Sequence, residues 1–177
     1  MRKRMEVSSE ILITHIKQGN IELLNDDQFE AFIPHAYRFF EAARQGASNK
    51  KLNILAAFIA KNINESVFDD NVASRIMKKI DYLSDNDLLI MSKIYRLYLS
   101  GQFFGDPMRE NLNFFSAKLV AEKYGVSWLS ASEHIVTLMA AGFLIPDGAA
   151  RFDKDEEYYY INSDFVAVCE IAIALNK

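Results

Sequence analysis

Apolar residues recur every three or four positions along most of the chain, a spacing typical of amphipathic α-helices. In the front half this spacing predicts helices over about residues 8–19, 34–46, 48–64 and 69–83. Ser8 and Ser9 are expected to cap the first helix, and Pro34 is expected in the first turn of the second, because proline disrupts a helix interior. A strand is the alternative for the first segment, which is rich in β-branched residues: Ile11, Ile13, Thr14 and Ile16.

The back half opens with a helix signal. Ser84 and Asp87 stand at the spacing of a capping box, with Asp in place of Glu. Apolar residues at helical spacing follow as far as Gly101, which is expected to end this helix. A loop is expected around residues 105–107, where Gly, Asp and Pro stand together.

Two shorter helices are expected next, each with a serine cap. Ser116 is the expected cap of a helix over residues 117–124, and Ser127 is the expected cap of a helix over residues 128–141. Gly125 between them is expected to make the tight turn, since glycine adopts positive φ without strain.

A β-hairpin and a last helix complete the predicted elements. Residues 143–145 and 157–161 are apolar and aromatic, as expected of strands, and residues 146–155 between them carry turn residues and charges. Ser163 is expected to cap the last helix, which contains Cys169.

This succession resembles the winged helix-turn-helix family. The resemblance rests on residues 119–127, on Ala131, Ser132, His134, Ile135 and Leu138, and on residues 141–145. It implies a winged helix-turn-helix domain over residues 84–177 with a small β-hairpin wing. Together with the helices expected in the front half, this predicts a mainly α protein whose N-terminal helical unit covers residues 1–83. The alternative is three helices followed by an unrelated hairpin.

Composition narrows the class of protein. Half of the 177 residues are hydrophobic, which is enough for a folded core, and no apolar stretch reaches the roughly 18 residues that a membrane span needs. The chain has one cysteine, Cys169, which excludes an internal disulfide framework and fits a reducing compartment. The sequence therefore predicts a cytoplasmic protein with no membrane partner, and a buried, inert cysteine.

No motif in the sequence indicates catalysis. The three histidines, His15, His35 and His134, form no metal-binding spacing, and no phosphate-binding glycine loop or nucleophile motif is present. The sequence therefore predicts a non-enzymatic protein without a metal or cofactor. Tyr158, Tyr159 and Tyr160 are expected to pack in a sheet, with a stacking platform for single-stranded nucleic acid as the alternative.

The helix over residues 128–141 is where this chain departs from DNA-binding members of the family. No Lys or Arg lies between residues 127 and 146, and the outward positions of this helix are mainly apolar. A helix that enters the major groove presents polar and basic side chains instead. The sequence predicts a protein-contact or dimerisation surface on this helix, with these candidate residues: Trp128, Leu129, Glu133, Val136 and Ala140.

A DNA-binding transcription regulator is the alternative function, since the resemblance itself implies DNA binding. Residues 1–84 carry a net charge of +1 and residues 85–177 carry −5, so the half that resembles a DNA-binding domain is the acidic half. Arg2, Lys3 and Arg4 form either a DNA-contacting arm or a frayed terminus. The candidate DNA contacts of the back half are Lys118, Lys123, Ser130, Thr137, Arg151 and Lys154.

Overall fold

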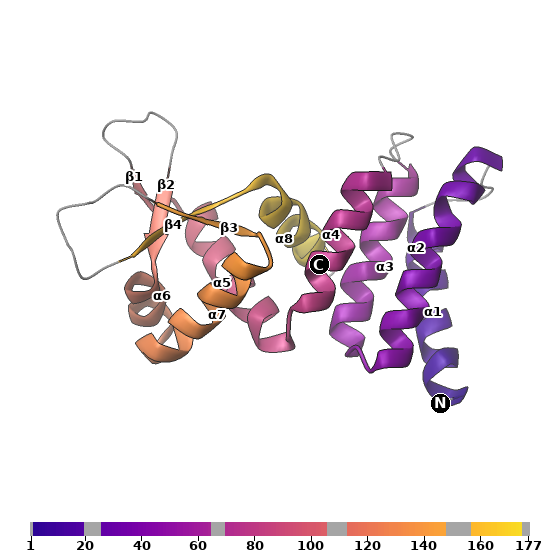
Figure 1. The fold of residues 1–177 in the computed structure, drawn as a ribbon, viewed down its shortest axis with the longest axis horizontal. Coiled ribbons are helices and arrows are strands. Elements are labelled where there is room, and N and C mark those ends of the chain that lie inside the picture. The colour runs from indigo at the N-terminus through magenta and orange to yellow at the C-terminus, as the bar shows by residue number, and fades with distance from the viewer. Residues whose placement is uncertain (1, 20–25, 65–69, 106–112, 148–156, 175–177) are drawn as a thin grey trace. The chain divides into compact units, whose positions relative to one another are not determined.

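The computed structural model describes residues 2–19, 26–64, 70–105, 113–147 and 157–174. These residues form eight α-helices and four short β-strands, so the protein is mainly helical (Figure 1). The helices are α1 (Arg2–Gln18), α2 (Asp26–Gln45), α3 (Asn49–Asn64), α4 (Asp70–Tyr82), α5 (Asp85–Leu99), α6 (Ala117–Tyr124), α7 (Trp128–Ala140) and α8 (Ser163–Ala174). The strands are β1 (Phe104–Gly105), β2 (Asn113–Ser116), β3 (Leu144–Pro146) and β4 (Tyr158–Ile161). Among the helices described, none is long and apolar enough to cross a membrane.

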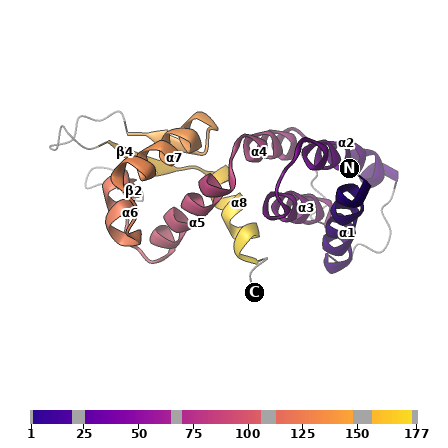
Figure 2. The ribbon, with the colours of Figure 1, turned by 90° about the horizontal axis from the view of Figure 1, so that it is seen from below.

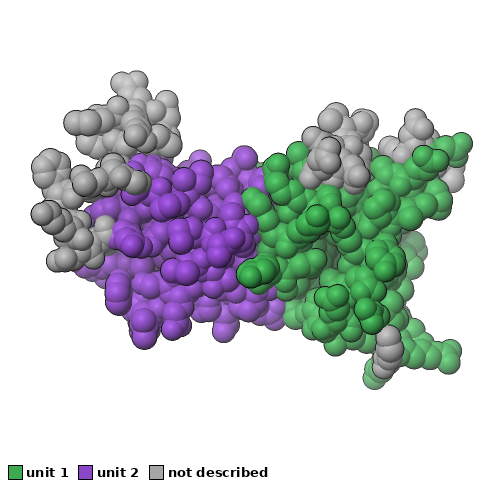
Figure 3. All heavy atoms as spheres, in the orientation of Figure 1, with its two compact units in different colours: residues 1–82, 170–177 green, residues 83–169 purple. Residues whose placement is uncertain are grey.

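Contacts between residues divide the chain into two compact units, which Figure 3 colours separately. Unit 1 comprises Met1–Tyr82 and Glu170–Lys177, and unit 2 comprises Leu83–Cys169. α8 therefore begins in unit 2 and ends in unit 1. The expected division after residue 83 assigned all of this helix to the back half.

Unit 1 contains the helices α1 to α4, of which α3 contacts the other three (Figures 1 and 2). His15 Nε2 on α1 lies 3.0 Å from Asn53 Oδ1 on α3. Arg38 on α2 donates to the carbonyl of Ser74 on α4 at 3.0 Å. The apolar spacing of the front half corresponds to side chains that are fully buried: Phe39, Leu52, Leu55, Ile59, Ile63, Met77 and Ile80.

α1 begins at Arg2, well before the expected caps. Ser8 and Ser9 lie inside the helix, and their hydroxyls donate to carbonyls one turn back at 2.8 and 2.9 Å. The predicted cap and the alternative strand are both wrong, because a hydroxyl bonded in this way does not interrupt a helix. The basic start is not a frayed end, since Arg4 lies in α1 and donates to the carbonyl of Ala47 at 2.6 Å.

α2 begins at Asp26 and holds Pro34 in its interior, so the predicted start at Pro34 is wrong. Proline lacks the N–H that would bond one turn back, and its ring crowds that carbonyl. The inner side of the helix offsets this cost through buried side chains beyond the proline, among them Phe39, Ala42 and Ala43.

Unit 2 begins with the capping box that the sequence predicted. Ser84 Oγ accepts from the amide of Asp87 at 3.2 Å, and Asp87 Oδ2 accepts from the amide of Ser84 at 2.7 Å. α5 then continues to Leu99, and Gly101 follows with φ of 66°. The predicted start and end of this helix are confirmed.

The serine caps of α6 and α7 are also confirmed. Ser116 Oγ accepts from the amide of Leu119 at 3.2 Å, and Ser127 Oγ accepts from the amide of Ser130 at 3.1 Å. Gly125 joins the two helices with φ of 61°, in the left-handed region that favours glycine. Each helix therefore begins where a local signal in the sequence places it.

An antiparallel sheet with the strand order β1-β2-β4-β3 accompanies these helices. Leu144 pairs with Ile161 and Phe115 with Tyr159, so the predicted hairpin strands are confirmed. Of the predicted turn, Pro146 belongs to β3 instead, and residues 148–155 lie outside the described residues. The expected loop around residues 105–107 is wrong at its start, because residue 105 belongs to β1.

The sequence did not predict β1 and β2. Phe114 and Phe115 in β2 are adjacent and both buried, so the strand lacks the polar–apolar alternation that marks a strand with one solvated face. The strand is defined by its pairing with Tyr158 and Tyr159, which lie far away in the sequence. Such long-range pairing leaves no local signal.

Aromatic rings cover both faces of this sheet. Tyr159 lies against Phe115 on one face, with 6.0 Å between ring centroids. Tyr158 and Tyr160 contact Phe114 on the other face, at 5.0 and 6.3 Å. These contacts confirm ordinary sheet packing of the three tyrosines, because their rings face other rings of the same sheet rather than forming an open platform.

Candidate functional site

α7 has one fully buried side. Ala131, Ile135 and Leu138 are all inaccessible to solvent, and α7 contacts α5, α6 and β3 on this side (Figures 1 and 2). These positions recur every three or four residues, so they form one face of the helix. All three are among the residues on which the family resemblance rests.

The opposite side of α7 is apolar and exposed. Leu129 and Val136 are 61% and 50% exposed, and Glu133 and Ala140 are exposed beside them. We call Leu129, Glu133, Val136 and Ala140 the outer stripe. Trp128, at the start of the helix, is 59% exposed and lies about 100° around the helix axis from Leu129. The structure therefore brings four of the five predicted protein-contact residues to one open side of α7 and leaves the fifth, Trp128, exposed at the N-terminal end of the same helix.

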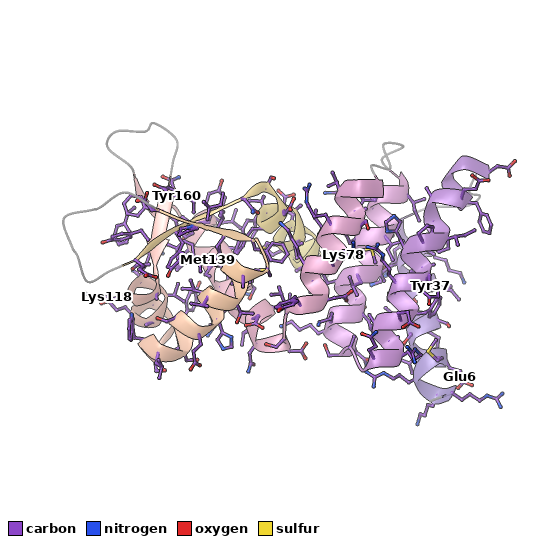
Figure 4. The ribbon with its side chains drawn as sticks, in the orientation of Figure 1. Glu6, Tyr37, Lys78, Lys118, Met139 and Tyr160 are labelled. Carbon is purple, nitrogen blue, oxygen red and sulfur yellow. The ribbon has the colours of Figure 1, made fainter. Side chains whose placement is uncertain are left out.

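The candidate DNA contacts are more scattered. Lys118 and Lys123 are exposed on α6, where Figure 4 labels Lys118. Ser130 and Thr137 on α7 are half-buried, and the Thr137 hydroxyl donates to the carbonyl of Glu133 at 3.1 Å. Arg151 and Lys154 lie outside the described residues. Of the six candidates, the structure thus describes two exposed cations, both on α6.

A third cation of unit 2 is engaged in a contact between helices. Lys93 Nζ on α5 lies 5.2 Å from the centroid of the Tyr124 ring on α6, within cation–π range. The Tyr124 hydroxyl donates to the carbonyl of Lys93 at 2.9 Å. Lys93 thus holds α6 against α5.

A buried carboxylate links α5 to α7. Asp87 is buried, and its Oδ1 lies 2.7 Å from His134 Nδ1, while Oδ2 accepts from the Ser84 amide and hydroxyl. Burial raises the pKa of Asp87, but hydrogen bonds from Ser84 and His134 outweigh burial, so this pKa lies below its ordinary value. Asp87 therefore stays ionised at neutral pH and fixes one side of α7 to the start of α5.

The sequence singled out both Asp87 and His134 but did not predict the contact between them. Asp87 was predicted to be a capping residue, and His134 was one of the residues on which the family resemblance rests. They are 47 positions apart, so only the fold brings them together. Both carboxylate oxygens are occupied by structural hydrogen bonds, so the pair acts first as a brace between helices.

The remaining histidines are internal. His15 is buried beside Asn53, and His35 is buried with Nδ1 at 3.3 Å from Met77 Sδ. Cys169 is buried as expected. Within the part of the chain that the structure describes, no three His, Cys, Asp or Glu side chains are grouped so as to hold a metal ion.

Comparison of the chain with models of protein families, with curated proteins and with solved structures found no match. Function is therefore proposed from the residues and their geometry. Of the surfaces described above, the outer stripe and Trp128 are the ones that both the sequence pattern and the structure single out.

Proposed function

We propose that unit 2 is a winged helix-turn-helix domain that works by binding rather than catalysis, and that it binds a protein through the outer side of α7. The observation that carries this proposal is the exposure of Leu129 and Val136 on a helix whose opposite side is fully buried. The contact fits either a partner protein or self-association.

The residues on which the family resemblance rests support the domain assignment. Ala121 and Ala131 are buried where α6 contacts α7, so their small side chains allow the two helices to approach. Gly125 and Gly142 both have positive φ, at the turn between the helices and at the end of α7. β3 follows directly and pairs with β4, as a wing would.

Exposed apolar area on α7 favours a protein partner. Full burial of a Leu or Val side chain contributes about 1.5–3 kcal/mol, which Leu129 and Val136 largely forgo while they face water. Contiguous exposed apolar residues with a polar rim mark protein contact sites. Trp128 adds a large side chain of the type that dominates binding energy in many interfaces.

Charge on α7 opposes DNA binding. Phosphates attract Lys and Arg, and α7 has neither, while its exposed Glu133 repels phosphate. Glu can accept from cytosine in the major groove, but the apolar residues on either side of Glu133 have no polar groups to position the helix on the backbone. Protein contact is therefore the function that this surface supports best.

The test is a double substitution, Leu129→Asp with Val136→Asp, in the full chain expressed in its own cells. We expect wild-type protein to sediment as a complex, with itself or with a partner, and the double variant to sediment as a monomer. A matched control, Lys118→Asp with Lys123→Asp on α6, should keep the complex. A double variant that retains the complex, or a wild-type protein that is monomeric and partner-free, would contradict the proposal.

A DNA-binding regulator is the second candidate, favoured by the exposure of Lys118 and Lys123 on α6. It predicts a mobility shift with duplex DNA at low salt. Replacing both lysines by alanine would then weaken binding and lower the salt dependence by roughly one counterion for each phosphate contact removed. No shift at low salt would exclude this candidate.

A further inference from the structure

The shape of the outer stripe fits another helix better than a flat surface. At about 100° per residue, its four positions fall within an arc of roughly 60°. With a rise of about 1.5 Å per residue, the stripe is some 16 Å long, or about three turns. A narrow, straight line of exposed positions, three of the four apolar, corresponds to the seam between two packed helices.

The spacing within the stripe strengthens this comparison. Leu129, Glu133, Val136 and Ala140 are separated by four, three and four residues, the alternation of a and d positions in a heptad repeat. Glu133 then occupies an a position, inside the line of contact. A polar residue at such a position selects its partner, because it must meet a complementary group there.

A second copy of the chain is a poor match for this seam. In an antiparallel pair that aligns all four positions, the symmetry axis passes between residues 134 and 135. The two Glu133 side chains then lie only about 4.5 Å apart along the helix axis. In a parallel pair in the same register, the two Glu133 side chains lie at the same height along the helix axis. Either pairing brings two carboxylates together in a seam from which water is being removed, and such like-charge contact is unfavourable.

We propose that the partner that occupies the outer stripe is an amphipathic helix of another protein, with a Lys or Arg opposite Glu133. This inference rests on the proposed function. The apolar residues supply the contact area, and the pairing of Glu133 with the cation supplies the selection. The apolar residues alone would bind many amphipathic helices. Glu133 restricts binding to helices that carry a positive charge at the position opposite it.

The chain provides its own reporter for the test. Trp128 is the single tryptophan, it is exposed, and it adjoins Leu129 at the N-terminal end of the stripe, so its fluorescence shifts to shorter wavelength when a bound helix covers this end. The probes are three synthetic helical peptides with a leucine seam at four-three-four spacing. They differ at one central seam position, which is Lys, Gln or Glu. Each is titrated into the full wild-type chain and into Glu133→Lys.

We expect the Lys peptide to bind wild-type protein about tenfold more tightly than the Glu peptide, the ratio that corresponds to about 1.4 kcal/mol, with the Gln peptide between them. In Glu133→Lys this order should reverse. A reversal cannot arise from misfolding, because a misfolded variant would lose all three peptides.

Equal binding of the three peptides would overturn the role of Glu133 and leave the proposed function standing. Binding of none of them would overturn the helical partner. Sedimentation of a wild-type dimer that Leu129→Asp abolishes and Glu133→Lys leaves unchanged would assign the stripe to a second copy. A Trp128 shift with duplex DNA that strengthens in Glu133→Lys would overturn both this inference and the protein-contact function.

Discussion

α6 and α7 are neighbours with the same construction and opposite surfaces. Each begins at a serine whose side chain accepts from the third residue of the helix, and each buries an apolar inner side. The exposed positions of α6 are charged, namely Lys118, Glu122 and Lys123. Those of α7 are mostly apolar. α6 is an ordinary amphipathic helix, whereas α7 is apolar on two sides.

The difference between the two helices separates apolar residues that form the core from apolar residues that the fold leaves exposed. Burial inside unit 2 accounts for every apolar residue of the inner sides. It does not account for Leu129 and Val136, which the fold leaves in water. The predictions that follow separate residues that stabilise the fold from residues that the fold does not need.

The largest expected effect is on the inner side of α7. Leu138→Ala should lower the free energy of unfolding by about 2–5 kcal/mol, because it leaves a cavity among fully buried side chains. Leu129→Ala on the outer side should change it by less than about 0.5 kcal/mol. Urea denaturation of both variants checks this contrast, and equal losses would show that the outer stripe is part of the core.

Asp87→Asn should lower the free energy of unfolding by about 1–3 kcal/mol near neutral pH, because it weakens both the capping box and the hydrogen bond to His134. The lowered pKa of Asp87 means that its ionised form contributes stability above the ordinary value of 3.8, and that this contribution is lost as pH falls through the lower folded value. As pH falls below 3.8, the difference in unfolding free energy between the variant and the wild type should therefore shrink progressively.

The exposed acid of α6 offers a control for this pH dependence. Glu122→Gln removes one carboxylate without touching the brace between α5 and α7, so it should leave the acid limb of the stability curve unchanged. If Asp87→Asn shows the same acid limb as the wild type, offset by a constant, the carboxylate is not the group that titrates.

Removal of the two serine caps should lower the free energy of unfolding by different amounts. Ser116→Ala should lower the free energy of unfolding by about 1–2 kcal/mol. Ser116 is buried, and its loss leaves the amide of Leu119 without its hydrogen-bond partner. Ser127→Ala should cost about 0.5–1 kcal/mol, because water replaces the exposed cap of α7. Thermal or urea unfolding measures both. The reverse order would mean that α7 depends on its cap more than on its packing.

The smallest effect is expected on the outer side of α6. Lys118→Ala and Lys123→Ala should each change unfolding free energy by less than about 0.5 kcal/mol. They should also leave the sedimenting complex intact. Loss of the complex in either variant would extend the contact surface from α7 to α6.

Local signals decided which elements the sequence could predict. The capping box at Ser84 and the turn at Gly125 depend only on residues within a few positions of one another, so the sequence could predict both. β2 depends on pairing with Tyr159, and α2 continues through Pro34 because of tertiary burial, so neither could be read locally.

The site follows the same rule. Helical spacing placed Leu129, Glu133, Val136 and Ala140 on one side of the helix, and the structure leaves these four residues exposed. The bond between Asp87 and His134 joins two separate helices, so no spacing in the sequence could reveal it.

The most direct test places a photo-crosslinking amino acid at position 129 of the full chain, in its own cells, with position 122 on α6 as the matched control. A surface that meets a protein predicts adducts with a defined protein from position 129 and none from position 122. Adducts with DNA from position 129, or the same adducts from both positions, would contradict a protein-contact surface on α7.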